Sequence, residues 1–419
     1  MKLKDILSSS DLHIDSARLA VRLGELGRIG WSSSGMNSLA YTKEDNLTYD
    51  MVEQYMITAG LSVRRDAAGN LVGRLEGTKK LPAVLCGSHL DSVYDGGIYD
   101  GRLGVLGAIE ALQVIHDLGL KPLHPIEVRA YRNEESCRFN PSISGAKMIT
   151  SQIDPQSLES FDRDGISFRG ALEQCGIDPE KLGSTILTSK DVKAHLELHI
   201  EQGDQLASAG LPVAVVTGIT TMKRGEITLV GKASHAGATP MNSRFDALCG
   251  AAEIILAAEK LAAESSGVVA TVGKVQVLPG GINIIPGEVR FSFDIRHPSP
   301  KVRDQLFENL RQKAEAVSIR RGLGFSFELW QSEEQELLCD LEIQDLIASL
   351  LPALGVEQLR LSSGAGHDSS SFMNLCPVGM IFVRSRNGSH NNLEFASAYD
   401  CALGSELLLR SLLVLAEVS

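Results

Sequence analysis

The sequence lacks any long apolar run. No segment approaches the roughly 18 consecutive apolar residues that a membrane-spanning helix needs. The first residues, MKLKDILSSSDLHID, also lack the apolar stretch of a signal peptide. We therefore expect a cytoplasmic protein with no membrane partner.

An excess of basic residues is missing as well. The chain has 40 Lys and Arg against 52 Asp and Glu, a formal net charge of −12. A nucleic-acid backbone is bound through clustered positive charge. Nucleic acid is therefore excluded as the expected partner, and no internal repeat or low-complexity tract points to another class of binding protein.

The sequence has no cysteine pairing pattern. Its seven cysteines are scattered, odd in number and form no C-x-x-C pair, which favours reduced thiols over a disulfide framework. Cys137 lies close to acidic residues, and these raise the pKa of a thiol. A catalytic cysteine is therefore disfavoured against burial as a small apolar side chain.

The chain does have enough length for two hydrophobic cores, with 419 residues. Between about 50 and 210, strand-like runs such as PAVLCGSH alternate with helical patterns such as GRLGVLGAIEALQVIHDLGL, which predicts a mainly parallel α/β sheet. Alternating strands and one helical pattern, RFDALCGAAEIILAAEKLAAE, then predict a smaller α+β domain. We predict a catalytic domain of residues 1–212 and 329–419, with residues 213–328 inserted into it.

The inserted domain offers an apolar helix and strands that can be sheet edges. Such edges are often covered by pairing with a second copy of the chain. We therefore predict a homodimer through residues 213–328, with a monomer whose edge is solvated as the alternative.

Acidic residues and a histidine follow an apolar run in GSHLDSVYDGGIYDG, residues 87–101. His89 and Asp91 are two residues apart and share one face of an extended segment, so Asp91 could orient His89 through its other ring nitrogen. Gly96 and Gly97 permit a turn that returns Asp100 to the start of a helix. Taken alone, the stretch could also be a loop of solvated aspartates.

Two adjacent glutamates, Glu134 and Glu135, follow the strand-like run IEVRAY. Neighbouring side chains at a strand end point to opposite sides, so one can bind a metal ion while the other reaches a metal-bound water. A charged, solvated turn is the alternative for the pair alone.

Imidazoles and carboxylates recur on one face of AHLELHIEQG, residues 194–203. Leucines and an isoleucine alternate with His195, Glu197, His199 and Glu201, where a half-buried strand normally shows Ser, Thr or Lys. His390 follows another strand-like run in a glycine-containing loop, a common location for a site residue. Imidazole and carboxylate ligands without thiolate suit Zn²⁺, Mn²⁺ or Co²⁺. Two ions sharing one carboxylate would use five ligands: His89, Asp100, Glu135, His199 and His390.

Seven motifs now stand in order along the chain. They are GSHLDSVYDGGIYDG, NEESCRF, ELHIEQG, SHAGATPMNSRFDA, GGINIIPGEVRFSFDIR, SGAGHDS and GSHN. Together they resemble the hydantoinase/carbamoylase group of M20 metallo-amidases from about residue 25 to 410. This group includes N-carbamoyl-L-amino acid hydrolases, allantoate and ureidoglycolate amidohydrolases and β-ureidopropionase.

The resemblance implies a di-metal catalytic domain, an inserted dimerisation or lid domain, and a role for each motif residue. His89 and His199 would hold one metal, Glu135 and His390 the other, and Asp100 would bridge them. Glu134 would be the general base, Asp91 the orienter of His89, and His235 the oxyanion donor, reaching across the dimer. The substrate, a small ureido carboxylate, would be bound by Gln202, Asn283, Arg296 and His367, with Arg296 on the carboxylate. Arginine suits that role because its planar fork grips a carboxylate with two parallel hydrogen bonds.

The sequence departs from the family pattern at a few positions. Ser136 and Cys137 stand where many members have Gly and Ser, GAT replaces GTT at 237–239, and Met222 and Lys223 replace the Gln-Arg of allantoate amidohydrolases. The predicted ligands and base are unaffected, so the departures bear on substrate choice alone.

Three hypotheses about function compete, and a fourth, a serine hydrolase, is weaker. Met222 favours hydrolysis of an N-carbamoyl-L-amino acid to amino acid, CO₂ and ammonia over cleavage of allantoate, ureidoglycolate or N-carbamoyl-β-alanine. A non-catalytic scaffold on the same fold would have lost Glu134 or a ligand, and none is lost. A serine hydrolase built on GHDSSSF lacks the G-x-S-x-G turn.

Overall fold

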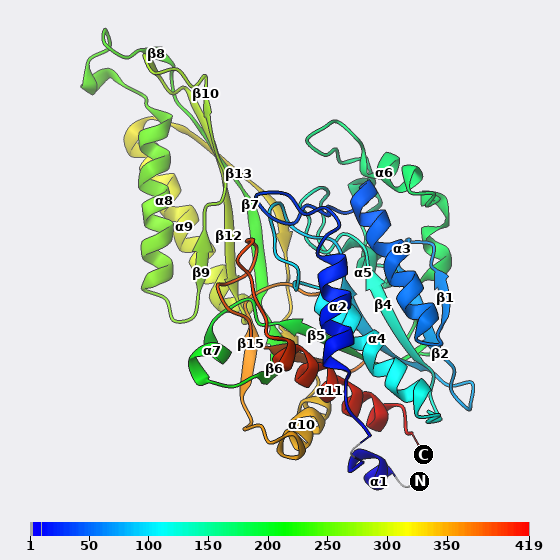
Figure 1. Ribbon diagram of the computed structural model, residues 1–419. Helices are drawn as coiled ribbons and strands as arrows, with labels where there is room; N and C mark the ends of the chain where they lie inside the picture. The colour runs from blue at the N-terminus through cyan, green and yellow to red at the C-terminus, as the bar shows by residue number, and fades with distance from the viewer. Residues whose placement is uncertain (1–2, 10, 419) are drawn as a thin grey trace. The chain divides into compact units, whose positions relative to one another are not determined.

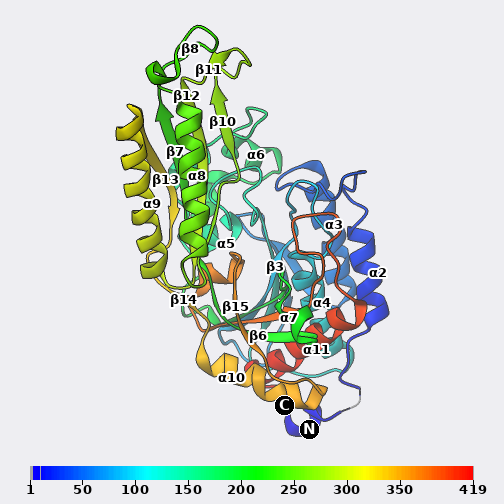
Figure 2. The ribbon, with the colours of Figure 1, turned by 90° about the vertical axis from the view of Figure 1, so that its left-hand side faces the viewer.

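The computed structural model describes residues 3–9 and 11–418, and the chain divides into two compact units (Figures 1 and 2). Unit 1 comprises Met1–Thr217 and Leu338–Ser419, and unit 2 comprises Gly218–Leu337. The boundaries differ from the predicted 213 and 328 for a physical reason. The strand β6 (Val213–Ile219) pairs within the sheet of unit 1, and β13 (Gly324–Ser332) continues past residue 328 in the sheet of unit 2.

Unit 1 is built on a mixed sheet with the strand order β1-β2-β4-β3-β5-β16-β6-β14, and β15 also pairs with β6. The middle strands β4, β3, β5 and β16 are parallel, while β2 and β6 join them antiparallel. The prediction of an α/β fold with a mainly parallel central sheet is confirmed. The further strands are β1 (Ser62–Arg65), β2 (Leu71–Leu75), β3 (Ala83–His89), β4 (Ile126–Tyr131), β5 (Val192–Ile200), β14 (Leu337–Leu338), β15 (Arg360–Ser363) and β16 (Val378–Val383).

Helices cover both faces of this sheet. The α-helices of unit 1 are α1 (Leu3–Leu7), α2 (Ser16–Leu26), α3 (Lys43–Thr58), α4 (Arg102–Asp117), α5 (Ser144–Ile149), α6 (Phe168–Gln174), α7 (Gln205–Ala209), α10 (Leu341–Leu350) and α11 (Ala398–Leu415). Its 3-10 helices are η1 (Pro155–Glu159), η2 (Pro179–Thr185), η4 (Leu351–Leu354) and η5 (Asp368–Phe372). The helix predicted before Gly119 is α4, which is buried along nearly its whole length.

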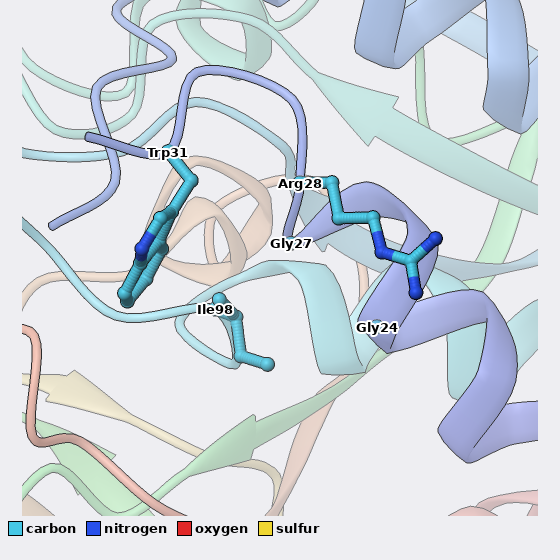
Figure 3. A pocket seen from close by; sticks show the side chains of 5 residues that line it. All are labelled: Gly24, Gly27, Arg28, Trp31 and Ile98. Atoms are coloured by element: carbon cyan, nitrogen blue, oxygen red, sulfur yellow. The ribbon is translucent and has the colours of Figure 1, made fainter. Parts of the chain in front are cut away.

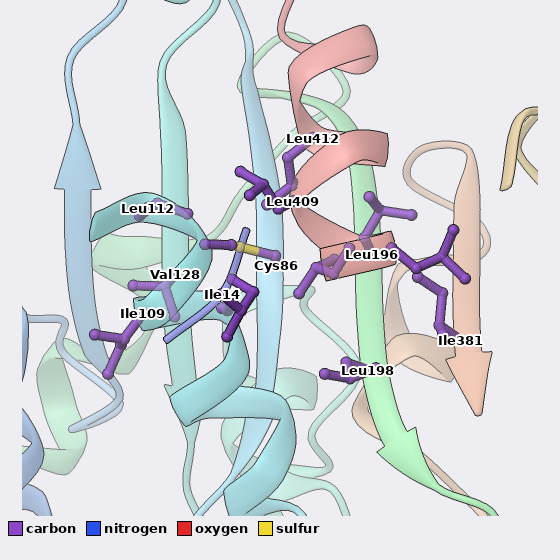
Figure 4. Packing of buried hydrophobic residues seen from close by; sticks show 14 of the residues in the cluster. Ile14, Cys86, Ile109, Leu112, Val128, Leu196, Leu198, Ile381, Leu409 and Leu412 are labelled. Carbon is purple, nitrogen blue, oxygen red and sulfur yellow. The ribbon is translucent and has the colours of Figure 1, made fainter. Parts of the chain in front are cut away.

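Side chains of the central strands in unit 1 pack into two different hydrophobic cores, one on each face of the sheet. Cys86 of β3 and Leu196 and Leu198 of β5 join Ile109 and other residues of α2, α4 and α11 in one core (Figure 4). Leu85 of β3 belongs to the second core, with Phe139, Phe168 and Phe372. Successive side chains of a strand point to opposite faces. The polar row His195, Glu197 and His199 therefore lies opposite Leu196 and Leu198, and it is fully buried.

Unit 2 is an antiparallel sheet with the order β10-β12-β7-β13, in which β9 also pairs with β12, and a two-stranded sheet of β8 and β11. Its core lies between the main sheet and two helices (Figure 2). The strands are β7 (Thr221–Val230), β8 (Ser234–His235), β9 (Val269–Thr271), β10 (Val275–Leu278), β11 (Ile284–Ile285) and β12 (Glu288–His297), and the helices are α8 (Ala247–Ala263), α9 (Pro300–Arg321) and the 3-10 helix η3 (Met241–Ser243).

The sequence pattern predicts α8 but not α9. The reason is that α9 buries only a narrow stripe, formed by Leu306, Leu310, Ala314 and Val317, within a largely charged segment. Such a sparse stripe gives a weak periodic pattern.

Two expectations about the whole chain can be compared with the structure. None of the described helices has the length and apolar character of a membrane span. All seven cysteines are free thiols. The pKa of Cys137 is raised to about 12, first by burial and then by Glu135, so this thiol is a poor nucleophile, as predicted.

Candidate metal centre

The predicted ligands of unit 1 lie at the carboxyl ends of neighbouring parallel strands. His89 is the last residue of β3, and His199 is the penultimate residue of β5. Glu135 and His390 lie in the segments after β4 and β16. Because parallel strands end at the same edge of a sheet, these segments meet there, where α/β proteins usually place their sites.

Asp100 lies at the centre of the group. Its Oδ1 is 3.1 Å from Nε2 of His199 and 3.5 Å from Nε2 of His89. Its Oδ2 is 3.6 Å from Nε2 of His390, and that nitrogen is 3.4 Å from Oε2 of Glu135. The structure thus brings together two sets of ligand atoms, each within 4.8 Å, that share Asp100: one with His89 and His199, the other with Glu135 and His390.

Backbone carbonyls fix the tautomers of the two buried histidines. The Nδ1 atom of His89 is 3.0 Å from the Asp91 carbonyl oxygen, and Nδ1 of His199 is 2.8 Å from the Ile200 carbonyl oxygen. A carbonyl only accepts hydrogen bonds, so each Nδ1 carries the hydrogen and each Nε2 keeps its lone pair. The Gly101 N–H donates to Nε2 of His199, which agrees with this assignment. Each Nε2 therefore has a lone pair next to the shared carboxylate that it can offer to a metal ion, and that of His199 accepts the Gly101 N–H in this structure.

The donor set fits divalent cations. Burial raises the pKa of Glu135 well above its ordinary value, and the neighbouring Asp100 and Glu134 raise it further. Burial likewise raises the pKa of Glu134 to about 7, although His89 lowers it. Oε1 of Glu135 is buried without a hydrogen-bond partner among the described residues. Carboxylates crowded in this way are stabilised when a cation lies between them, and imidazole and carboxylate ligands suit Zn²⁺, Mn²⁺ or Co²⁺.

Asp91 holds the glutamate pair rather than the His89 ring. Its Oδ1 accepts the N–H of Glu134 at 3.2 Å, and its Oδ2 accepts the N–H of Glu135 at 3.3 Å. The carboxylate is 3.7 Å from Nδ1 of His89, whose hydrogen bond goes to the Asp91 carbonyl instead. The spacing of His89 and Asp91 had predicted that the Asp91 carboxylate would make this contact. Strand β3 ends at His89, so the shared-face argument for an extended segment does not extend to Asp91.

The two glutamates also differ from the predicted opposite orientation. Both offer an oxygen within 4.8 Å of a His89 nitrogen. They lie beyond the end of β4 at Tyr131, and Asn133 and Ser136 on either side of them have positive φ values of 55° and 52°. A turn of this kind does not alternate its side chains as a strand does.

Gln202 and His367 lie beside the ligands in unit 1. The Gln202 amide donates to Oδ2 of Asp100 at 2.7 Å, and its Oε1 is buried without a hydrogen-bond partner among the described residues. The His367 ring is 4.5 Å from the His199 ring, and its Nε2 is 2.7 Å from the Ser363 hydroxyl. Gln202 therefore adjoins the candidate ligand Asp100, and His367 adjoins the candidate ligand His199.

The remaining three predicted residues belong to unit 2. His235 and Asn283 are exposed, on and beside the small β8–β11 sheet. Nδ1 of His235 accepts the N–H groups of Gly237 and Ala238, so the hydrogen of a neutral ring is on Nε2. Arg296 of β12 donates from Nε and Nη2 to Asp294 at 3.0 and 2.9 Å.

Two glutamates make hydrogen bonds to segments that carry or adjoin the candidate ligands, and the sequence did not predict these contacts. Glu197, which was predicted among the possible ligands, has an oxygen within 4.8 Å of ring nitrogens of His199 and His367. It also accepts hydrogen bonds from the Ser88 hydroxyl and the Ser369 N–H. Glu394 accepts the N–H of Asp100. None of these hydrogen bonds can be read from spacing, because each joins segments that are more than 100 residues apart.

A cavity of about 480 Å³ lies beside residue 98, in the loop that leads to Asp100. It is lined by Gly24, Gly27, Arg28, Trp31 and Ile98 (Figure 3). None of the candidate ligands is among these residues, so this cavity is separate from the ligand cluster.

Known proteins are similar to this chain over most of its length. Residues 85–413 match the peptidase family M20/M25/M40. An N-carbamoyl-L-amino acid amidohydrolase of Geobacillus stearothermophilus is 42% identical over 96% of this chain and 99% of that protein. The allantoate amidohydrolase of Escherichia coli (strain K12) is 36% identical over 92% of this chain and 94% of that protein. A hydantoinase/carbamoylase family amidase from Burkholderia vietnamiensis has a solved structure that matches with a TM-score of 0.90 and 31% identity, covering 97% and 99% of the two chains.

Proposed function

The chain belongs to the M20/M25/M40 peptidase family, and on that premise we propose that it removes the carbamoyl group from N-carbamoyl-L-amino acids. Its relatives are amidohydrolases, so it is a hydrolase of C–N bonds, and the enzymes of its family use divalent metal ions. The products would be the L-amino acid and carbamate, which decomposes to CO₂ and ammonia.

One observation carries the proposal. Two sets of ligand atoms share Asp100, and Glu134 lies near His89 of one set and Glu135 of the other without belonging to either set. His89, His199 and Asp100 would hold one cation, and Glu135, His390 and Asp100 the other. Such ions polarise a carbonyl oxygen and lower the pKa of a coordinated water from 15.7 toward about 7.

Glu134 supplies the proton transfers in this proposal. Its carboxylate accepts the proton of the attacking water and returns it to the leaving nitrogen. Asp91 keeps Glu134 in place through the Glu134 N–H, at 3.2 Å. One side chain thus acts as base and then as acid, so the two steps balance without a second proton donor.

The predicted residues of unit 2 would bind and polarise the substrate. His235 would donate from Nε2 to the oxyanion, since its Nδ1 already accepts two backbone N–H groups. Arg296 would bind the substrate carboxylate with the fork that it now presents to Asp294. We propose that His235 acts in this way on the site of a partner chain, in a homodimer formed through unit 2.

The choice among ureido substrates rests on Met222. This residue lies directly opposite Arg296 across the β7–β12 pair and is 3% exposed. Side chains directly opposite one another share a face of the sheet, so an apolar group adjoins the proposed carboxylate clamp. That neighbour suits an apolar amino-acid side chain better than the second ureido group of allantoate or the hydroxyl of ureidoglycolate, which remain the alternatives.

The test is ammonia release from protein reconstituted separately with Zn²⁺, Mn²⁺ and Co²⁺. The panel contains N-carbamoyl-L- and D-methionine, allantoate, ureidoglycolate and N-carbamoyl-β-alanine. We expect the highest kcat/KM for the N-carbamoyl-L-amino acid and little turnover of its D enantiomer. A higher kcat/KM for any other member of the panel would replace the proposed substrate with that compound.

A further inference from the structure

Glu394 joins two loops that carry proposed ligands. It follows β16 in the same loop as His390, and its side chain is 6% exposed. Its Oε1 accepts the backbone N–H of Tyr99 at 2.9 Å and of Asp100 at 3.2 Å. The carboxylate therefore fixes the main chain at Asp100, immediately before α4 begins.

Ser389 extends this contact to the Asp100 side chain. The Ser389 hydroxyl oxygen is 2.5 Å from Oε2 of Glu394 and 2.6 Å from Oδ2 of Asp100. A closed ring of polar contacts thus runs from the Asp100 amide through Glu394 and Ser389 to the Asp100 carboxylate, in which the single Ser389 hydrogen is donated to one carboxylate at a time. Ser389 directly precedes His390, so the same ring also fixes the loop that presents this histidine.

The sequence leaves room for Glu394 at Gly97. A Cβ atom at this position would lie 2.3 Å from Oε1 of Glu394 and 2.4 Å from its Cδ. Any side chain at Gly97 would therefore displace the glutamate. This accounts for the second glycine of YDGGIYD in terms of Glu394 rather than of a turn alone.

The loop that carries His390 and Glu394 is held by hydrogen bonds between its two ends, so Glu394 has a fixed position. Arg386 and Phe395 exchange backbone hydrogen bonds, and the Asn387 amide donates to the Leu393 carbonyl at 2.8 Å. His390 adopts a positive φ of 59° within this loop. A left-handed residue of this kind persists where its surroundings hold it, and Glu394 and Ser389 are among those surroundings.

We propose that Glu394, acting through Ser389, is a positioning residue that orients the Asp100 carboxylate as the bridge between the two cations. Oδ1 faces His89 and His199, and Oδ2 faces His390. A carboxylate free to rotate would not keep one oxygen for each ion. This inference rests on the proposed metal centre, and its main consequence is for the ion held by Glu135 and His390, since His390 is on the loop that the ring secures.

The test compares metal affinity in three alanine variants: Glu394→Ala, Ser389→Ala and the control Glu201→Ala. Glu201 is 8% exposed and also accepts two backbone N–H groups, those of Gln205 and Leu206, each at 2.8 Å, but it contacts neither Asp100 nor Ser389. Each purified protein is titrated with Mn²⁺ and with Zn²⁺, and the bound metal is counted by elemental analysis. Loss of such a supporting contact typically weakens metal affinity about 10–100-fold.

We expect Glu394→Ala to raise the Kd of the ion held by Glu135 and His390 by about this factor, with the Kd of the ion held by His89 and His199 changed much less. With saturating metal, kcat should fall while KM for the substrate changes little, because Glu394 does not adjoin the predicted substrate groups. Ser389→Ala should change the same Kd in the same direction, and Glu201→Ala should not. Unchanged affinity for both ions in Glu394→Ala, or an equal loss in Glu201→Ala, would overturn the proposal.

The conservative variant Glu394→Gln distinguishes the effect of the hydrogen bonds of Glu394 from the effect of its side-chain volume. Its amide oxygen can accept the same two N–H groups, and its NH₂ can donate to the Ser389 oxygen, whose hydrogen still goes to Asp100. We expect near-normal affinity for the ion held by Glu135 and His390 in this variant, and a loss as large as that of Glu394→Ala would overturn the proposed role of the Glu394 contacts. Because metal binding is measured without substrate, inactivity on every ureido compound would end the proposed function and leave this test intact.

Discussion

The proposed chemistry of unit 1 is built differently from the substrate contacts proposed for unit 2. In unit 1, His89, Asp100 and His199 are 2%, 8% and 1% exposed, and each makes hydrogen bonds to the backbone or to neighbouring side chains. In unit 2, His235 and Asn283 are exposed, on and beside a two-stranded sheet. His89, Asp100 and His199 are thus held in a packed setting, whereas His235 and Asn283 are accessible to a substrate. Among the proposed ligands His390 differs, with 52% of its side chain exposed, and among the proposed substrate residues His367 differs, since it is buried.

This contrast predicts that substitutions in the two units have different kinetic signatures. Changes at the ligands of unit 1 should alter metal content or the chemical step. Changes in unit 2 should leave metal content intact and affect the oxyanion or the substrate carboxylate. The predictions below test this division, beginning with the largest effect.

Glu134→Gln should retain both metal ions and lose about 10²–10⁴-fold in kcat, because an amide cannot accept the proton of water. Glu135→Gln should instead bind less metal, since it replaces a ligand. Elemental analysis and kcat at saturating metal distinguish the two variants. If Glu135→Gln kept its metal and Glu134→Gln lost it, the two roles would have to be exchanged.

His235→Ala should lower kcat by about 10²–10³-fold with normal metal content, as expected for removal of one oxyanion donor. A histidine that serves only the local β8–β11 structure would affect stability and leave kcat nearly unchanged. Thermal unfolding measured beside kcat separates these outcomes.

The same residue tests the proposed homodimer. Mixing Glu134→Gln chains with His235→Ala chains should restore about a quarter of the wild-type activity. Random mixing makes half of the dimers mixed, and a two-fold symmetric pair would then have one intact site of two. Inactive mixtures, with subunit exchange verified by native mass spectrometry, would show that His235 acts within its own chain.

Arg296→Lys should raise KM for N-carbamoyl-L-amino acids by about 10–100-fold, the equivalent of a charge-assisted hydrogen bond of roughly 1.5–3 kcal/mol. The effect should be much smaller for a carbamoyl compound without a carboxylate. Equal increases for both compounds would remove Arg296 from the clamp and leave it as the ion-pair partner of Asp294, to which it donates at 2.9 Å.

The sequence allowed the ligand set to be predicted for a physical reason. His89 and His199 lie at the ends of apolar strands, and the glutamate pair follows one. Because the carboxyl ends of parallel strands lie at the same edge of a sheet, these residues can be predicted to lie close together without knowledge of contacts between distant segments. The role of Asp91 could not be predicted in this way, because it depends on where β3 ends and on the turn after β4. Glu394 was missed because its contacts reach Tyr99 and Asp100 across almost 300 residues of chain. The helix α9 was missed because its buried stripe is too narrow to dominate a charged segment.

Met222→Gln should have the smallest effect and bears on specificity alone. Its side chain is 3% exposed and lies opposite Arg296 in the β7–β12 pair. A glutamine there offers a hydrogen bond to a polar substrate group, worth about 1 kcal/mol or roughly fivefold. We therefore expect the ratio of kcat/KM for allantoate to that for N-carbamoyl-L-methionine to rise by about this factor. Met222→Leu, which keeps the position apolar and similar in volume, is the matched control and should leave the ratio unchanged. If both variants shifted the ratio equally, packing around Met222 rather than its polarity would govern the choice of substrate.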